Sequence, residues 1–181
     1  MSKNIIALVE KGFNILEAKT LVGIIRYSKK FNIIYIIDSD NNGSTSYDVL
    51  GFGKKIPITS SLQNALEECK SNNIVIDSLL LGTAPRGGIL PKSWRTIIID
   101  AMKNKLNIIN PLHYLFNEDK EFKRISLENS VTLWDVRKQK IPDRVPNLSA
   151  HELKENIILT VGTDCNVGKM TSAIHINNEL N

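Results

Sequence analysis

Unbroken runs of apolar residues alternate with helically spaced apolar residues as far as about residue 137. Each unbroken run predicts a strand covered on both faces, because a half-exposed strand would alternate apolar with polar side chains. Between the runs, Ile15, Ala18, Leu21, Val22 and Ile25 follow the spacing of an amphipathic helix. The predicted strands cover residues 5–9, 32–38, 74–82, 106–110 and 131–137. The predicted helices cover residues 15–30, 60–70, 91–105 and 113–130.

This alternation predicts the fold class and the domains. Strands separated by helices form right-handed βαβ units, so residues 1–137 are predicted to be an α/β, Rossmann-like, doubly wound parallel sheet. Residues 138–155 hold two prolines and few apolar residues, which indicates a linker. Residues 156–181 are predicted to be the first strand, loop and helix of a P-loop domain, with the strand at 156–162.

Composition narrows the function classes. The net charge of +4 is spread over Lys and Arg residues scattered among acidic ones, which indicates a solvated surface rather than a nucleic-acid footprint. Cys69 and Cys165 form no Cys-x-x-Cys pair, so neither a disulfide scaffold nor a structural zinc site is expected, and a cytoplasmic location fits. No apolar stretch is long enough to span a membrane or to form the core of a signal peptide. The sequence leaves a homo-oligomer open.

The clearest chemical motif follows the linker, where the run GTDCNVGKMT comes directly after an apolar strand and before a helical segment. Glycines at 162 and 168 permit tight backbone turns, so that successive N–H groups can point into one concavity and bind phosphate oxygens. The start of the helix adds the positive end of its dipole, and Lys169 adds a full charge. The predicted phosphate-binding residues are Gly162, Thr163, Asp164, Cys165, Asn166, Val167, Gly168, Lys169, Met170 and Thr171.

Two features of the loop depart from the usual P-loop pattern. Five residues separate Gly162 from Gly168, where four are usual. Met170 follows the lysine, where a magnesium-binding Ser or Thr is usual, and Thr171 comes one residue later. Whether Thr171 takes the Mg²⁺ role therefore stays open, and Asp164 is a second candidate near the metal.

The loop resembles that of dethiobiotin synthetase-like NTPases. It is still more similar to a two-domain P-loop family long described as a domain of unknown function, whose members are now described as D-glutamate N-acetyltransferase-like. That resemblance extends to DSDNNGSTSYDVLGFGKKIPI (38–58), GTAPRGGILPKSW (82–94) and LWDVR (133–137). It implies a Rossmann-like N-terminal domain joined to a C-terminal P-loop domain. Because such members are longer, we expect this chain to be an N-terminal fragment that turns over no nucleotide alone.

A second anion site is predicted at the carboxyl ends of the strands in the N-terminal domain, where the loops of a parallel sheet form a ligand crevice. Asp38 ends a strand at the position of a ribose-binding acid, although only one glycine follows the first strand and a turn cap is the alternative. Arg86 offers a guanidinium for an anion, and His113 is a candidate acid or base. The residues of this predicted site are Asp38, Asn42, Gly43, Gly82, Thr83, Arg86, Gly87, Gly88 and His113.

Three functions remain open at this point. The resemblance implies that the parent protein transfers an acetyl group from acetyl-CoA to D-glutamate or a similar small acidic amino acid. The dethiobiotin-like loop instead suggests an ATP-dependent ligase or kinase-like enzyme that uses ATP with Mg²⁺. The third hypothesis is a non-catalytic module that binds a nucleotide-like phosphate compound. The sequence names no catalytic residue for any of them.

Overall fold

The computed structural model describes residues 2–83, 85, 90–138, 152–164 and 167–180. The chain folds as two units, residues 1–140 and 141–181.

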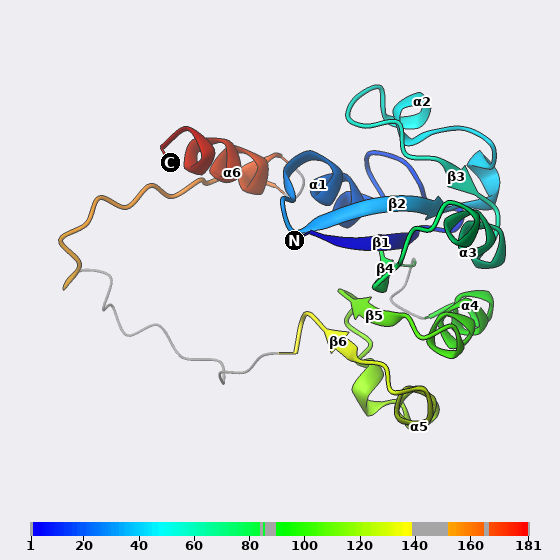
Figure 1. Cartoon of the computed structure of the whole chain (residues 1–181). Coiled ribbons are helices and arrows are strands. Elements are labelled where there is room, and N and C mark those ends of the chain that lie inside the picture. Colours follow the sequence, from blue (N-terminus) through cyan, green and yellow to red (C-terminus); the bar gives the residue numbers. More distant parts are fainter. Residues whose placement is uncertain (1, 84, 86–89, 139–151, 165–166, 181) are drawn as a thin grey trace. The chain divides into compact units, whose positions relative to one another are not determined.

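The first unit is built on a parallel sheet of six strands with the order β3-β2-β1-β4-β5-β6, so the Rossmann-like prediction is confirmed (Figure 1). The chain starts in the middle of the sheet, builds outward to β3, and then crosses back to place β4 on the other side of β1. The point between β1 and β4 is the topological switch point, where loops diverge and leave a crevice. The strands are β1 (Lys3–Leu8), β2 (Phe31–Ile37), β3 (Ile58–Thr59), β4 (Ser78–Leu81), β5 (Asn107–Asn110) and β6 (Leu133–Asp135).

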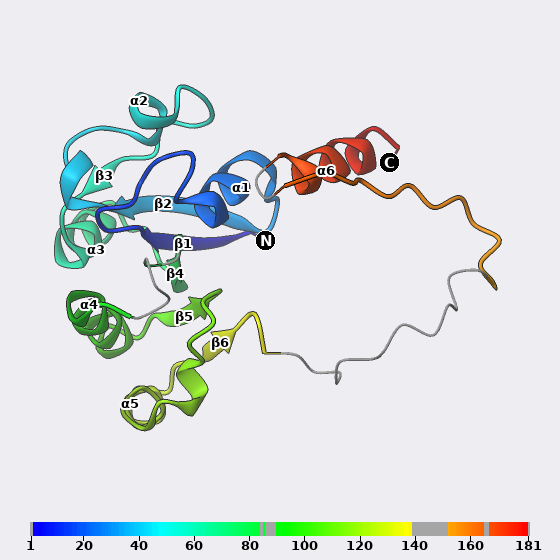
Figure 2. The same cartoon turned by 180° about the vertical axis from the view of Figure 1, so that it is seen from behind.

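Helices cover both faces of this sheet, as Figures 1 and 2 show from opposite sides. On one face lie α1 (Lys19–Tyr27) and α2 (Ser46–Leu50), packed on strand residues such as Ile5 and Ile36. On the other face lie α3 (Leu62–Ser71), α4 (Lys92–Lys103) and α5 (Lys120–Asn129). Two short 3₁₀ turns, η1 (Ser39–Asn41) and η3 (Phe116–Glu118), follow β2 and β5.

Side chains on alternate strand positions enter two separate cores. Ile6 and Leu8 of β1 pack with α3, α4 and α5, whereas Ile5 and Ala7 of the same strand pack with α1 and α2. All four are fully buried. This accounts for the unbroken apolar runs in the sequence, because both faces of each central strand are covered.

Local signals explain where several elements begin and end. The Ser61 side chain accepts a hydrogen bond from the Asn64 N–H and caps α3. Helix α2 and strand β3 were not predicted. The signal for α2 was present as a capping box, in which Thr45 and Asp48 bond each other's backbone N–H groups. Strand β3 has only two residues and leaves no periodic pattern.

The predicted strand at 74–82 is too long, because its first residues close the preceding helix. Asn73 adopts a left-handed φ of 55°, and the Ile74 N–H donates to the Cys69 carbonyl 2.8 Å away. Only Ser78–Leu81 then pairs with β1. Apolar character alone therefore does not separate the strand from the segment that leads into it.

In the second unit, α6 (Lys169–Leu180) begins at the predicted lysine. The predicted strand at 156–162 is wrong for this structure, because these residues pair with no strand within the described part of the unit. Ile157, Ile158, Leu159 and Val161 are exposed there. A strand is defined by its ladder of hydrogen bonds, so an apolar sequence without a neighbouring strand stays extended but unpaired.

Candidate phosphate-binding loop and ligand crevice

The loop before α6 folds back on itself around Gly162. A Cβ atom at this position would lie 2.6 Å from Cγ2 of Val167 and 3.2 Å from Cγ of Lys169. Only a residue without a side chain therefore lets the loop close this tightly. The close approach brings the start of the loop against the residues that open the helix.

The Lys169 side chain lies along the same loop. Its Nζ donates a hydrogen bond to the backbone carbonyl of Asp164, with 2.5 Å between nitrogen and oxygen. Gly168, directly before the lysine, has a φ of 90°, a left-handed value that strains any other residue. Its carbonyl accepts the first helical hydrogen bond, from the Ser172 N–H at 2.9 Å. The ammonium group is thus held against the carbonyl of Asp164, and the left-handed Gly168 leads into the helix that carries it.

The first turn of α6 supplies the remaining donors. The backbone N–H groups of Lys169, Met170 and Thr171 precede the first i to i−4 bond of the helix, so they point out of its N-terminus. The Met170 side chain is 69% exposed, and Thr171 is half-buried. Cys165 and Asn166 lie outside the described residues. Of the predicted phosphate-binding residues that are described, Gly162 and Asp164 therefore lie close to the Lys169 side chain.

In the first unit, a cavity of about 490 Å³ opens at the switch point between β1 and β4. Its lining combines charged groups with an aromatic and proline wall. The residues that line it are Glu10, Lys11, Gly12, Glu17, Thr83, Pro85, Pro91 and Trp94. Of the described residues of the predicted second site, only Thr83 is among them.

Asp38 is fully buried at the end of β2, and it anchors the loop that follows β1. Its Oδ1 accepts a hydrogen bond from the backbone N–H of Lys11 at 2.7 Å, and its Oδ2 accepts one from Asn41 at 2.5 Å. Burial raises the pKa of this carboxyl, although the two hydrogen bonds act in the opposite direction. The same loop is tied down by Glu10, which accepts hydrogen bonds from the N–H and the hydroxyl of Ser39.

Gly82 and Thr83 position α1 against the end of β4. A Cβ atom at Gly82 would lie 2.6 Å from Cγ1 of Val9 and 2.9 Å from Cβ of Leu21. The Gly82 carbonyl accepts the Leu21 N–H at 3.0 Å, which occupies one of the donors at the start of α1. The Thr83 hydroxyl donates to the carbonyl of Glu17 at 2.8 Å.

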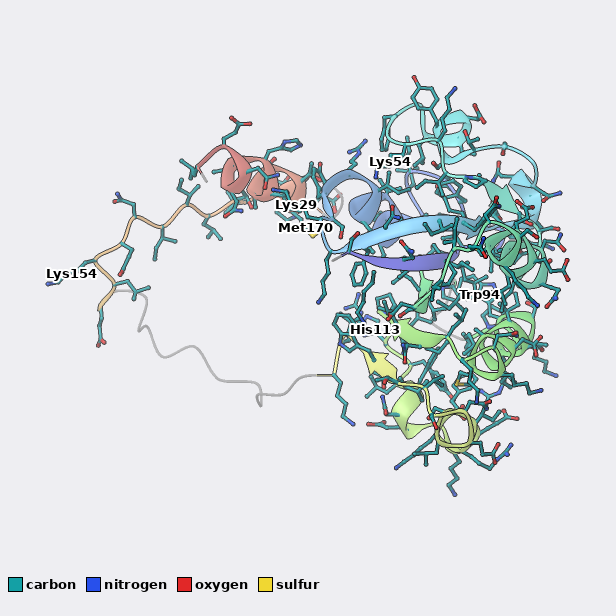
Figure 3. All side chains as sticks on the ribbon, viewed as in Figure 1. Lys29, Lys54, Trp94, His113, Lys154 and Met170 are labelled. Atoms are coloured by element: carbon teal, nitrogen blue, oxygen red, sulfur yellow. The ribbon has the colours of Figure 1, made fainter. Side chains whose placement is uncertain are left out.

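Three described members of the predicted anion site, Asn42, Gly43 and His113, do not line this cavity. Asn42 and Gly43 are exposed in the turn after η1, and Gly43 has a φ of 83° with nothing within 4 Å of a built Cβ. His113 lines a separate hollow of about 290 Å³ with Tyr114 and Asp119. Figure 3 shows His113 well apart from Trp94. Arg86, Gly87 and Gly88 lie outside the described residues, so their part of the site stays a prediction.

Beside the His113 hollow, Arg95 of α4 binds Asp119 at the start of α5. Both terminal nitrogens of the guanidinium donate to the carboxylate, at 2.8 and 2.9 Å. Asp119 also accepts the Tyr114 hydroxyl and caps α5 through the N–H groups of Glu121 and Phe122. Arg95 holds the pKa of Asp119 well below its usual range. This fully bonded cluster joins two helices.

The predicted site omits seven of the eight described residues that line the switch-point cavity, among them Glu10, Lys11, Glu17 and Trp94. For Glu10 and Lys11, the sequence did hold a sign of a binding site, because both follow β1 at the carboxyl edge of the sheet. Lys11 gives a further sign in the structure, since its φ of 58° is left-handed. Non-glycine residues held in that conformation are concentrated at functional sites. Glu17 and Trp94 carry no such signal in the sequence.

Two absences hold for the residues that the structure describes. Among them, no group of three or more His, Cys, Asp or Glu side chains is placed to hold a metal ion. No helix in those same ranges is long and apolar enough to cross a membrane.

The sheet order and the glycine turn around Lys169 define a protein with a Rossmann-like domain followed by a P-loop segment. Residues 39–139 match the family described as "Domain of unknown function (DUF1611_N) Rossmann-like domain", and residues 144–181 match "Domain of unknown function (DUF1611_C) P-loop domain". The chain belongs to the DUF1611 family. The resemblance drawn from the sequence is thereby confirmed.

A solved relative supports the same assignment. A crystal structure of a DUF1611 family protein from Anabaena variabilis is 27% identical, with a TM-score of 0.85 over 99% of this chain and 50% of the other. Two curated proteins named D-glutamate N-acetyltransferase are also similar. The Pseudoalteromonas protein is 31% identical over 62% of this chain, and the Tritonibacter scottomollicae protein is 28% identical over 72%. The matches span 33% and 37% of those two proteins, about a third of each.

Proposed function

We propose that the loop from Gly162 to Thr171 binds the phosphate groups of a nucleotide-like compound, and that the protein is an N-acetyltransferase acting on D-glutamate or a similar acidic amino acid. The observation that carries the first part is the position of Lys169, whose ammonium group lies 2.5 Å from the Asp164 carbonyl across the Gly162 turn. The names of the two curated relatives support the second part.

The loop fits phosphate in three ways. A phosphate oxygen accepts N–H groups at a helix N-terminus, and the helix dipole adds to that attraction. Lys169 neutralises charge and has two further N–H donors besides the one it gives to Asp164. A Cβ atom on any other residue at position 162 would fill the space beside Val167 and Lys169. Glycine leaves this space open, so the backbone can approach the ligand closely.

Acetyl-CoA is the proposed donor, because its phosphates suit this loop and its thioester supplies the acetyl group. The amine nitrogen attacks the thioester carbonyl, the C–N bond forms as the C–S bond breaks, and the amine proton passes to the leaving thiolate through a base. For ATP with Mg²⁺, the alternative, Thr171 and Asp164 are the loop oxygens that would hold the metal. Mg²⁺ in such sites takes only one or two protein oxygens and completes its shell with phosphate and water.

Calorimetric titration of the 181-residue chain with CoA, and separately with ATP and Mg²⁺, tests this proposal. Lys169→Ala is expected to weaken binding of the preferred ligand by about 10- to 100-fold, the effect of losing a hydrogen bond to a charged group. Lys154→Ala is the matched control, since it removes one exposed lysine of the same unit outside the loop. Equal binding by all three proteins, or no binding by the wild type, contradicts the proposal. Preference for ATP with Mg²⁺ over CoA favours the ligase-type alternative.

A further inference from the structure

Among the described residues, the lining of the cavity at the β1–β4 switch point carries more acidic than basic groups. Glu10 and Glu17 contribute two carboxylates to its lining, and Lys11 contributes one ammonium group. The buried carboxylate of Asp38 lies directly behind the Lys11 backbone, 2.7 Å from its N–H. We infer that this cavity binds a small α-amino acid, with Glu10 and Glu17 facing its ammonium group and Lys11 facing a carboxylate.

The charge of the cavity argues against a phosphate ligand. A phosphate placed between Glu10 and Glu17 meets repulsion from two carboxylates, and among the described residues of the lining one lysine opposes it. A dinucleotide bound in the Rossmann manner also needs free N–H groups at the start of α1. One of these, from Leu21, already donates to the Gly82 carbonyl. The two units of the chain therefore offer different chemistry, with phosphate donors around Lys169 and ammonium acceptors in this cavity.

The groups that would face the ligand are fixed before it binds. Ser39 donates both its N–H, at 2.9 Å, and its hydroxyl to the Glu10 carboxylate. Asp38 holds Lys11 in a left-handed conformation, with φ at 58°. The Thr83 hydroxyl holds the backbone of Glu17 at 2.8 Å. A preformed site loses less conformational entropy on binding, which favours a small ligand with few contacts.

The size and the apolar wall suit an amino acid. The volume of about 490 Å³ lies in the range of small-molecule sites. Trp94, which is 4% exposed, and the rings of Pro85 and Pro91 present an apolar surface to an aliphatic chain. Charged groups from the segment between β1 and α1, together with an apolar surface around Trp94, suit a ligand that has both kinds of surface. That the bound amino acid is the acetyl acceptor rests on the proposed function, whereas its binding here does not.

The test uses the two tryptophans of the chain, Trp94 and Trp134. Trp134→Phe removes the one on β6, which is 43% exposed, and leaves Trp94 as a fluorescent reporter in the cavity. D-glutamate is expected to change Trp94 fluorescence in a saturable manner. Glutarate, which lacks the ammonium group, is expected to bind at least about tenfold more weakly, the loss of one charge-assisted contact. Equal binding of glutarate, or no response to D-glutamate, overturns the inference without any further variant.

Variants then locate the contacts. In the Trp134→Phe background, Glu17→Gln is expected to weaken D-glutamate binding by about tenfold and to abolish its preference over glutarate. Glu67→Gln on α3 is the control, because Glu67 is exposed and does not line the cavity. Loss of binding in the control alone overturns the assignment to this cavity. Lys169→Ala separates the two proposals: a Trp94 response that survives it supports the amino-acid site even where CoA and ATP binding fail.

Discussion

The backbone N–H of Lys11 donates to the buried carboxylate of Asp38 at 2.7 Å, and this bond joins the loop after β1 to the end of β2. In a dinucleotide-binding domain, the acid at this place is available to a ribose. Here its Oδ2 is also occupied, by Asn41. Asp38 therefore serves as a structural anchor for the loop that carries Glu10 and Lys11 into the switch-point cavity.

This anchor predicts a pH dependence of stability. Burial raises the folded-state pKa of Asp38, so the native protein holds a proton on this group at pH values where the unfolded chain has lost it. The wild type is thus expected to gain stability relative to the Asp38→Asn variant as pH falls from 7 towards about 4, the ordinary pKa of Asp. Urea unfolding of both proteins across this window measures the difference. A difference in the free energy of unfolding that is constant, or that shrinks as pH falls, contradicts a raised pKa of Asp38 in the folded protein.

Gly82 and Gly23 form a matched pair for stability. A methyl group at Gly82 meets Val9 and Leu21 at less than 3.0 Å, so Gly82→Ala is expected to cost about 1–3 kcal/mol through overpacking. Gly23 lies within α1 with nothing within 4 Å of a built Cβ. Gly23→Ala is expected to add about 0.5–1 kcal/mol, because alanine loses less backbone entropy in a helix. Chemical denaturation that gives the same sign for both substitutions refutes the packing described at Gly82.

The Arg95–Asp119 pair predicts the opposite response to acid. The folded-state pKa of Asp119 is lowered, so the carboxylate contributes fully to the stability of the protein at pH values above the unfolded pKa of about 4. This stabilisation is lost as pH falls through the lower pKa of the folded state. Asp119→Asn is expected to cost about 2 kcal/mol at pH 7, between the values for exposed and buried pairs. That cost should shrink as the solution is acidified below pH 4.

The control for this pair is Arg124→Gln. Arg124 binds Glu128 four residues further along α5, and both side chains are more than half exposed. Its loss is expected to change stability by no more than about 0.5 kcal/mol at any pH. Thermal unfolding across the acid range compares the two variants, and an Asp119→Asn cost that does not depend on pH would argue against the pairing.

The sequence predicts most of the sheet because covered strands need unbroken apolar runs. It predicts the loop around Lys169 because glycine, lysine and a helix start must be adjacent in the chain to cradle phosphate. The switch-point cavity is different, since Glu10, Glu17, Thr83 and Trp94 come together only through the crossover that places β4 beside β1. The spacing of these residues along the chain therefore does not predict that they line one cavity. Asp38 is the opposite case. It stands at a position typical of a binding site, but its carboxylate accepts hydrogen bonds from Lys11 and Asn41 of the fold itself.

The central claim is that the turn around Lys169 binds phosphate oxygens through backbone N–H groups. The most direct measurement is amide NMR of the ¹⁵N-labelled chain during titration with CoA, and with ATP and Mg²⁺. The account predicts saturable shifts of the Gly168, Lys169, Met170 and Thr171 amides with one of these ligands, at concentrations that leave the Lys169→Ala variant unchanged. Amides in this turn that stay unmoved by both ligands, or that move equally in the variant, would contradict it.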